Sequence, residues 1–103
     1  MIIKMIEYVS AFAEDKDTAR DIRNNIISPA LANNEEVILD FTGISSATQS
    51  FIHALIRELI KEFGIDCLDK MKFKECNQQV KTIIQIVVAY IQDSQDDEYY
   101  SKG

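Results

Sequence analysis

The fold is decided by the stretch Val37-Ile38-Leu39-Asp40-Phe41-Thr42-Gly43-Ile44, which leads into the hydroxyl-rich run Ser45-Ser46-Ala47-Thr48-Gln49-Ser50. An uninterrupted apolar triplet at 37–39 is typical of a short strand that is covered on both faces. The run that follows fits a capping box, in which Ser46 satisfies a free helix amide and Gln49 reaches back to the cap. We therefore expect a central strand, a turn and the start of a helix in direct succession.

The segment after this turn has the clearest helical pattern of the chain. Its apolar residues recur in adjacent pairs at every fourth position and form one stripe on a helix. They are Phe51, Ile52, Leu55, Ile56, Leu59, Ile60 and Phe63. Gly64 follows directly and is a typical helix stop.

On the N-terminal side, residues 2–9 are rich in β-branched and aromatic types and predict a first strand. A first helix is expected to begin at Asp15 or Asp17, because either is a good N-cap. Pro29 should end or kink that helix near Ile27, since proline lacks an amide donor and clashes with the preceding turn.

On the C-terminal side, residues 70–74 alternate lysine with Met71 and Phe73, which predicts an edge strand with its lysines facing outward. Asn77 can cap a last helix. The apolar arc of that helix is made of Val80, Ile83, Ile84, Val87, Val88 and Ile91. Ile86 and Tyr90 widen this arc beyond what one sheet can cover.

Three strands that alternate with three helices predict an α/β fold, with a small, largely parallel or mixed sheet of three to four strands packed by three helices. We expect one domain over 1–92, followed by an acidic, flexible C-terminal tail over 93–103. The predicted core residues lie on the inward faces of both element types. They are Val37, Leu39, Leu55, Leu59 and Phe73.

Composition narrows the class of protein. The chain has 103 residues and a formal net charge of −6, which disfavours nucleic acid and anionic membranes as partners. Charges interrupt the N-terminal apolar run too early for a signal peptide, and no apolar segment reaches the roughly 20 residues of a membrane span. Cys67 and Cys76 are expected to be free thiols. The free thiols and the lack of a signal peptide or membrane span predict a cytoplasmic protein.

The inventory of reactive groups argues against an enzyme. His53 is the only histidine and hence the only conventional base, and it falls at the edge of the apolar stripe, where a packing or surface role is typical. The three glycines match no phosphate-binding motif. Asp40 ends the central strand and could suggest a phospho-acceptor, but no clustered acids accompany it to hold magnesium. We expect no catalytic residue, no cofactor and no metal.

The hydroxyl-rich turn has two interpretations. One is simple helix capping. The other is a recognition or phosphorylation surface, because a helix N-terminus has free amides and tolerates added negative charge. The candidates for partner binding or a phospho-switch are Ser45, Ser46, Thr48, Gln49, Ser50 and His53. Ile86 and Tyr90 are the candidates for self-association.

The strand at 37–44, with its hydroxyl-rich turn and amphipathic helix, resembles the core of the STAS domain of anti-sigma-factor antagonists. The runs ATQSFIHAL at 47–55 and MKFKECN at 71–77 are similar to the STAS-like family of unknown function. The resemblance covers 36–92, over half of the chain.

This resemblance implies a sheet flanked by helices, no catalytic activity, and regulatory proteins as partners, including ATPases of the histidine-kinase-like fold. In the antagonists an aspartate precedes the phosphorylated serine. On this chain Thr48 falls at the aspartate and Gln49 at the serine, with Ser50 one place later, so the sequence departs from the antagonists there. The leading hypothesis is a regulatory binding module that docks a partner through 45–50 and the following helix. The alternative is a structural subunit that dimerises, as a homodimer, through the apolar last helix.

Overall fold

The computed structural model describes the backbone of residues 1–102 and the side chains of residues 1–93. A three-stranded sheet is formed by β1 (Ile2–Lys4), β3 (Val37–Asp40) and β5 (Met71–Lys74), in the order β1-β3-β5. Both pairings are parallel, and Leu39 lies between its register partners on the two outer strands. The predicted α/β fold class and the central position of the strand at 37–40 are confirmed.

The first strand is shorter than predicted. β1 ends at Lys4, and the 3₁₀ turn η1 (Met5–Glu7) follows, in which the amides of Tyr8 and Val9 both donate to the Met5 carbonyl. Met5 is fully buried in this turn. The apolar residues after Lys4 therefore fill the core from a turn, which a short apolar run cannot distinguish from a strand.

A second sheet of two parallel strands was not predicted. β2 (Phe12–Ala13) pairs with β4 (Ser46–Ala47), so the hydroxyl-rich turn contains a short strand. Each strand has only two residues, which is too short for an alternating pattern to appear in the sequence.

The first helical segment is continuous from Lys16 to Ala32 and includes α1 (Lys16–Ile22), the π-turn η2 (Arg23–Ile27) and α2 (Ser28–Ala32). Asp15 is its N-cap, because its carboxylate accepts a bond from the Asp17 amide at 2.9 Å. Pro29 does not end the helix at Ile27. Instead, the helix widens into the π-helical turn η2 just before Pro29, so the predicted disturbance near Ile27 is a π segment and not a helix end.

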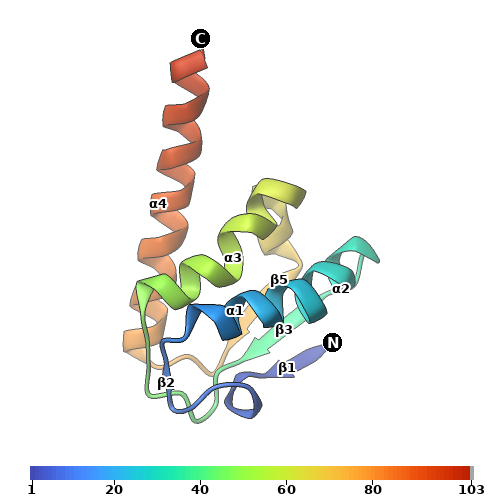
Figure 1. Cartoon of the computed structure of the whole chain (residues 1–103), viewed down its shortest axis with the longest axis vertical. Helices are drawn as coiled ribbons and strands as arrows, with labels where there is room; N and C mark the ends of the chain where they lie inside the picture. Colours follow the sequence, from blue (N-terminus) through green and yellow to red (C-terminus); the bar gives the residue numbers. More distant parts are fainter. Residues whose placement is uncertain (103) are drawn as a thin grey trace.

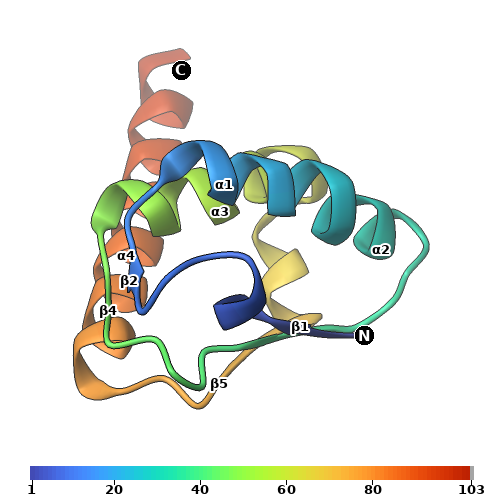
Figure 2. The ribbon, with the colours of Figure 1, turned by 60° about the horizontal axis from the view of Figure 1, so that its bottom comes forward.

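Helix α3 (Gln49–Phe63) lies beside α1 on one face of the three-stranded sheet (Figure 2). Gly64 ends it with a positive φ of 85°, a conformation that favours glycine, and the 3₁₀ segment η3 (Ile65–Asp69) leads into β5. Figure 1 shows α4 (Gln78–Lys102) packed beside the start of α3 and then extending beyond the body of the molecule.

Helix α4 continues past the predicted end of the domain at 92. Its backbone is helical as far as Lys102, but the side chains beyond Asp93 lie outside the described residues. The flexible acidic tail over 93–103 therefore stays a prediction. In the part of the chain that the structure describes, none of the helices has both the length and the apolar character needed to cross a membrane.

The core lies between the sheet and the α1–α3 layer. Four of the predicted core residues are buried: Val37, Leu39, Leu55 and Leu59. Phe73 is only half-buried and packs against this core, with its ring 6.4 Å from that of Phe41. The partial exposure of Phe73 follows from the edge position of β5, where Lys72 and Lys74 are exposed as predicted.

Candidate functional site

The hydroxyl-rich turn is held in place by two side chains from the start of α4. The Asn77 side-chain amide donates to the Ser45 carbonyl at 2.8 Å, while its oxygen accepts from the Val80 amide and caps α4 as predicted. Gln79 bonds to both backbone groups of Ala47, with distances of 2.9 Å to the amide and 3.1 Å to the carbonyl. The turn is therefore fixed to a neighbouring helix by hydrogen bonds, which restricts its conformation.

Thr48, and not Ser46, is the N-cap of α3. The Thr48 hydroxyl accepts a bond from the Phe51 amide at 3.1 Å. Ser46 lies two residues earlier in β4, where its amide donates to the Ala11 carbonyl. The predicted capping box of Ser46 and Gln49 is therefore wrong, because pairing with β2 keeps residue 46 extended and delays the helix by two residues.

Most of the predicted contact residues are exposed to solvent. Ser45, Thr48, Gln49 and Ser50 are exposed, whereas Ser46 is half-buried. Gln49 and Ser50 occupy the first turn of α3, where backbone amides have no intrahelical partner and the helix dipole favours negative charge. This end of the helix is therefore open to a polar or anionic group.

The structure brings three of the six partner-binding candidates and both self-association candidates together in one hollow, whereas Ser45, Ser46 and Thr48 lie outside its lining. Gln49, Ser50 and His53 line it from α3, and Ile86 and Tyr90 line it from α4; its volume is about 250 Å³. Ile86 is 44% exposed and Tyr90 is 61% exposed, which agrees with the prediction that the core does not cover them. We call this feature the α3–α4 hollow.

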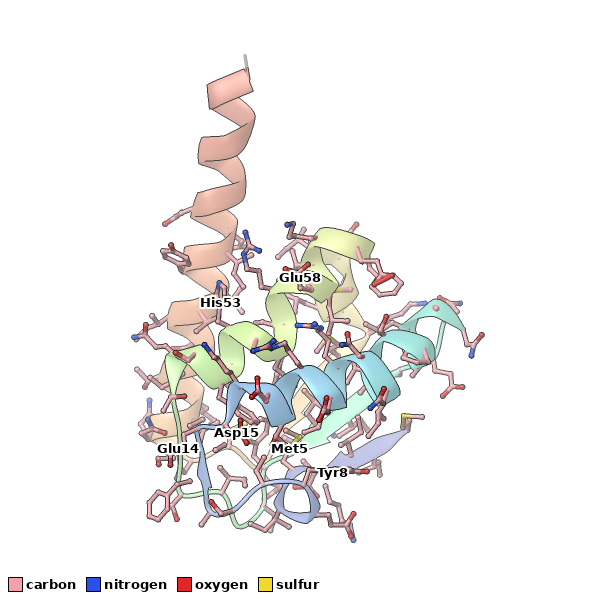
Figure 3. All side chains as sticks on the ribbon, viewed as in Figure 1. Met5, Tyr8, Glu14, Asp15, His53 and Glu58 are labelled. Carbon is pink, nitrogen blue, oxygen red and sulfur yellow. The ribbon has the colours of Figure 1, made fainter. Side chains whose placement is uncertain are left out.

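His53 is the central side chain of this region. Figure 3 shows it between α3 and α4, and its ring lies 6.2 Å from that of Tyr90 in an edge-on arrangement. Burial lowers the pKa of His53 below its usual value, and Arg57 acts in the same direction, whereas Glu58 opposes them. His53 is therefore neutral at pH 7, and its half-buried ring lines the α3–α4 hollow.

Other reactive groups lie away from the hollow. Asp40 accepts bonds from the Thr42 hydroxyl and amide, which lower the pKa of Asp40 and tie it into the turn after β3. Burial raises the pKa of both Cys67 and Cys76, so both remain protonated thiols at pH 7. In the described residues, no group of three metal-ligating side chains comes together.

Sequence reasoning missed one residue of the site, Gln79. Its role depends on a contact with Ala47, 32 positions earlier in the chain, which no local pattern reveals.

Comparison with known proteins gives one match. The family model described as the STAS-like domain of unknown function (DUF4325) matches residues 18–81. The matched region includes most of α1, the hydroxyl-rich turn, all of α3 and the side chains that fix the turn, but it ends before Ile86 and Tyr90. No curated protein and no solved structure matches the chain.

Proposed function

The chain belongs to the STAS-like domain family of unknown function (DUF4325), and from this premise we propose that it is a non-catalytic regulatory module that binds a partner protein. The partner docks on the turn 45–50 and the first turns of α3. The module acts in the cytoplasm, and its partner is a regulatory protein. The resemblance to anti-sigma-factor antagonists favours an ATPase of the histidine-kinase-like fold as that partner.

The observation that supports this proposal is the combination of a fixed turn and an open hollow. Bonds from Asn77 and Gln79 restrict the turn before any partner arrives, so little conformational entropy is lost on binding. Next to this turn, exposed Ile86 and Tyr90 offer apolar surface. A restricted polar segment beside an exposed aromatic side chain is typical of protein-binding surfaces.

The chemistry of the turn also supports a regulated contact. Thr48 and Ser50 carry hydroxyls at the start of α3, and Ser50 is exposed in the first helical turn. A negative charge added there is compatible with the helix dipole, so it changes the surface without unfolding the domain. The partner can thus read the charge state of this position.

The substitution Ser50→Asp tests the proposal. The added carboxylate should leave folding unharmed or stabilise it by about 0.3–1 kcal/mol, because it lies at a helix N-terminus. At an interface, desolvation of an unpaired charge should weaken binding by orders of magnitude. The measurement is calorimetry with a partner recovered from the native host.

Asn33→Asp is the control for the added charge, because it adds the same charge at the exposed C-terminal end of α2, away from the start of α3 (Figure 1). The helix dipole disfavours a negative charge at that end, so the stability of this control is measured as well. This control should bind the partner as the unmutated chain does. Equal affinity of the partner for Ser50→Asp and for the unmutated chain would exclude the turn as the contact surface.

The alternative function is that of a structural subunit that self-associates through the apolar surface of α4. The exposure of Ile86 and Tyr90 also supports this alternative. Ile86→Glu tests this alternative, since it should abolish self-association of this kind and yield a smaller particle in light scattering. A monomeric unmutated chain at high concentration would exclude the alternative.

A further inference from the structure

A second hollow lies on the outer side of α1 and α3, and its lining includes four basic side chains. Its volume is about 640 Å³. Arg20 and Arg23 line it from the first helical segment, and Arg57 and Lys61 line it from α3. We call this feature the basic groove. It adjoins the α3–α4 hollow, because His53 lines both.

The charge of the basic groove is opposite to that of the whole chain. Its four cations face two lining carboxylates, Glu58 and Glu62, and Arg20 is also paired with Asp17 outside the lining, which leaves one net positive charge in a chain of net charge −6. His53 adds no charge there at pH 7, because burial lowers its pKa. Such a local inversion of sign attracts a negatively charged segment.

Hydrogen bonds and ion pairs fix three of the four cations of the groove, but only two of the four are paired with a carboxylate. Arg23 donates across the groove to the Ala54 carbonyl at 2.7 Å, and this bond fixes its guanidinium between the two helices. Arg57 pairs with Glu58 at 3.2 Å, and Arg20 pairs with Asp17 at 2.7 Å. Among the described side chains, no ion pair involves Arg23 or Lys61, so their charges remain available to an incoming carboxylate.

The densest negative charge of the chain lies in its last residues. Positions 93–98 carry four acids, Asp93, Asp96, Asp97 and Glu98, and Lys102 is the one base after them. Beyond the body of the molecule α4 extends alone, so the backbone of this acidic segment lies away from α1 and α3 of its own chain (Figure 1).

We propose that the basic groove of one copy receives the acidic segment 93–98 of a second copy of this chain. Two copies that exchange these segments around a two-fold axis form a closed dimer, because each groove is then occupied. This association is independent of partner docking on the turn. It is also distinct from an apolar dimer, because its main contacts are ionic and weaken when salt screens them.

Charge reversal in the full-length chain tests the proposal. A groove variant carries Arg57→Glu and Lys61→Glu, and a tail variant carries Asp93→Lys, Asp96→Lys and Asp97→Lys. Sedimentation velocity should show a salt-sensitive dimer for the unmutated chain at low ionic strength. Each variant alone should self-associate at least roughly tenfold more weakly, because its groove and its tail then have the same sign.

Mixing the two variants gives the decisive result. The acidic tail of the groove variant meets the basic groove of the tail variant, and the reverse pair also matches, so the mixture should form a heterodimer. Circular dichroism checks that both variants are folded.

Three results would overturn the proposal: a monomeric unmutated chain at low salt, folded variants that do not associate when mixed, or a salt-insensitive dimer that only Ile86→Glu dissociates. The first two results leave docking of a partner on the turn untouched, whereas the third would favour self-association through the apolar surface of α4.

Discussion

Helices α3 and α4 are both amphipathic in sequence, yet the structure uses them differently. Helix α3 lies across the sheet, and its apolar stripe is buried in full apart from the half-buried Phe63. Helix α4 contacts mainly α3 and β4, so only one side of its wider arc is covered. The uncovered side presents Ile86 and Tyr90. Helix α3 therefore contributes its apolar stripe to the core, whereas α4 leaves apolar side chains exposed to solvent.

The largest expected effect is a difference in stability loss between two alanine substitutions, one at a leucine of α3 and one at an isoleucine of α4. Leu59 is 1% exposed, so Leu59→Ala should lower the free energy of unfolding by about 2–5 kcal/mol through loss of burial and formation of a cavity. Ile86→Ala should change it by less than about 0.5 kcal/mol, since exposed positions contribute little. Denaturant unfolding measures both. Equal losses would contradict the division of roles between the two helices.

A smaller effect is expected where α4 supports the turn. Gln79→Ala removes the bonds to the Ala47 amide and carbonyl, which are partly buried, and should cost about 1–3 kcal/mol. Gln78→Ala is the matched control, because Gln78 is exposed and bonds only within its own helix, to Thr82. Chemical denaturation of the two variants side by side is the measurement. If Gln79→Ala is as stable as Gln78→Ala, the side chain does not fix the turn.

The smallest expected loss of stability is that of removing a hydroxyl at the start of α3. Thr48→Ala should cost about 1 kcal/mol, because it removes the acceptor for the Phe51 amide. Ser46→Ala should cost less, since the bonds of Ser46 to β2 use its backbone. Thermal melts of both variants decide the order. A larger loss of stability for Ser46→Ala would indicate that Ser46, the residue favoured by the sequence pattern, is the N-cap.

That pattern shows where sequence reasoning succeeds. The strand at 37–40, the helix after the turn and the edge strand with its lysines follow from local periodicity, and all three are present. Ser46 and Thr48 both carry hydroxyls suited to a cap, so local chemistry alone leaves two possible starting points for the helix. The pairing of β4 with β2, a contact between distant segments, decides between them.

The candidate site could be predicted only in part, because local patterns identify its residues but not the contacts between distant segments. Ser50 and His53 were found from the helix start, and Ile86 and Tyr90 from an arc too wide for one sheet. That these two pairs meet in one hollow depends on how α4 crosses α3, which periodicity does not encode. Gln79 was missed because its partner lies in the turn and not in its own helix.

Hydrogen–deuterium exchange on the chain, with and without a partner recovered from the native host, tests the central claim most directly. If the turn, the start of α3 and the exposed side of α4 form the contact surface, the partner should slow exchange in peptides covering 45–53 and 83–90. Peptides covering β1 and β5 should exchange as they do in the free chain. Slowed exchange confined to the sheet strands, with 45–53 unchanged, would contradict the account.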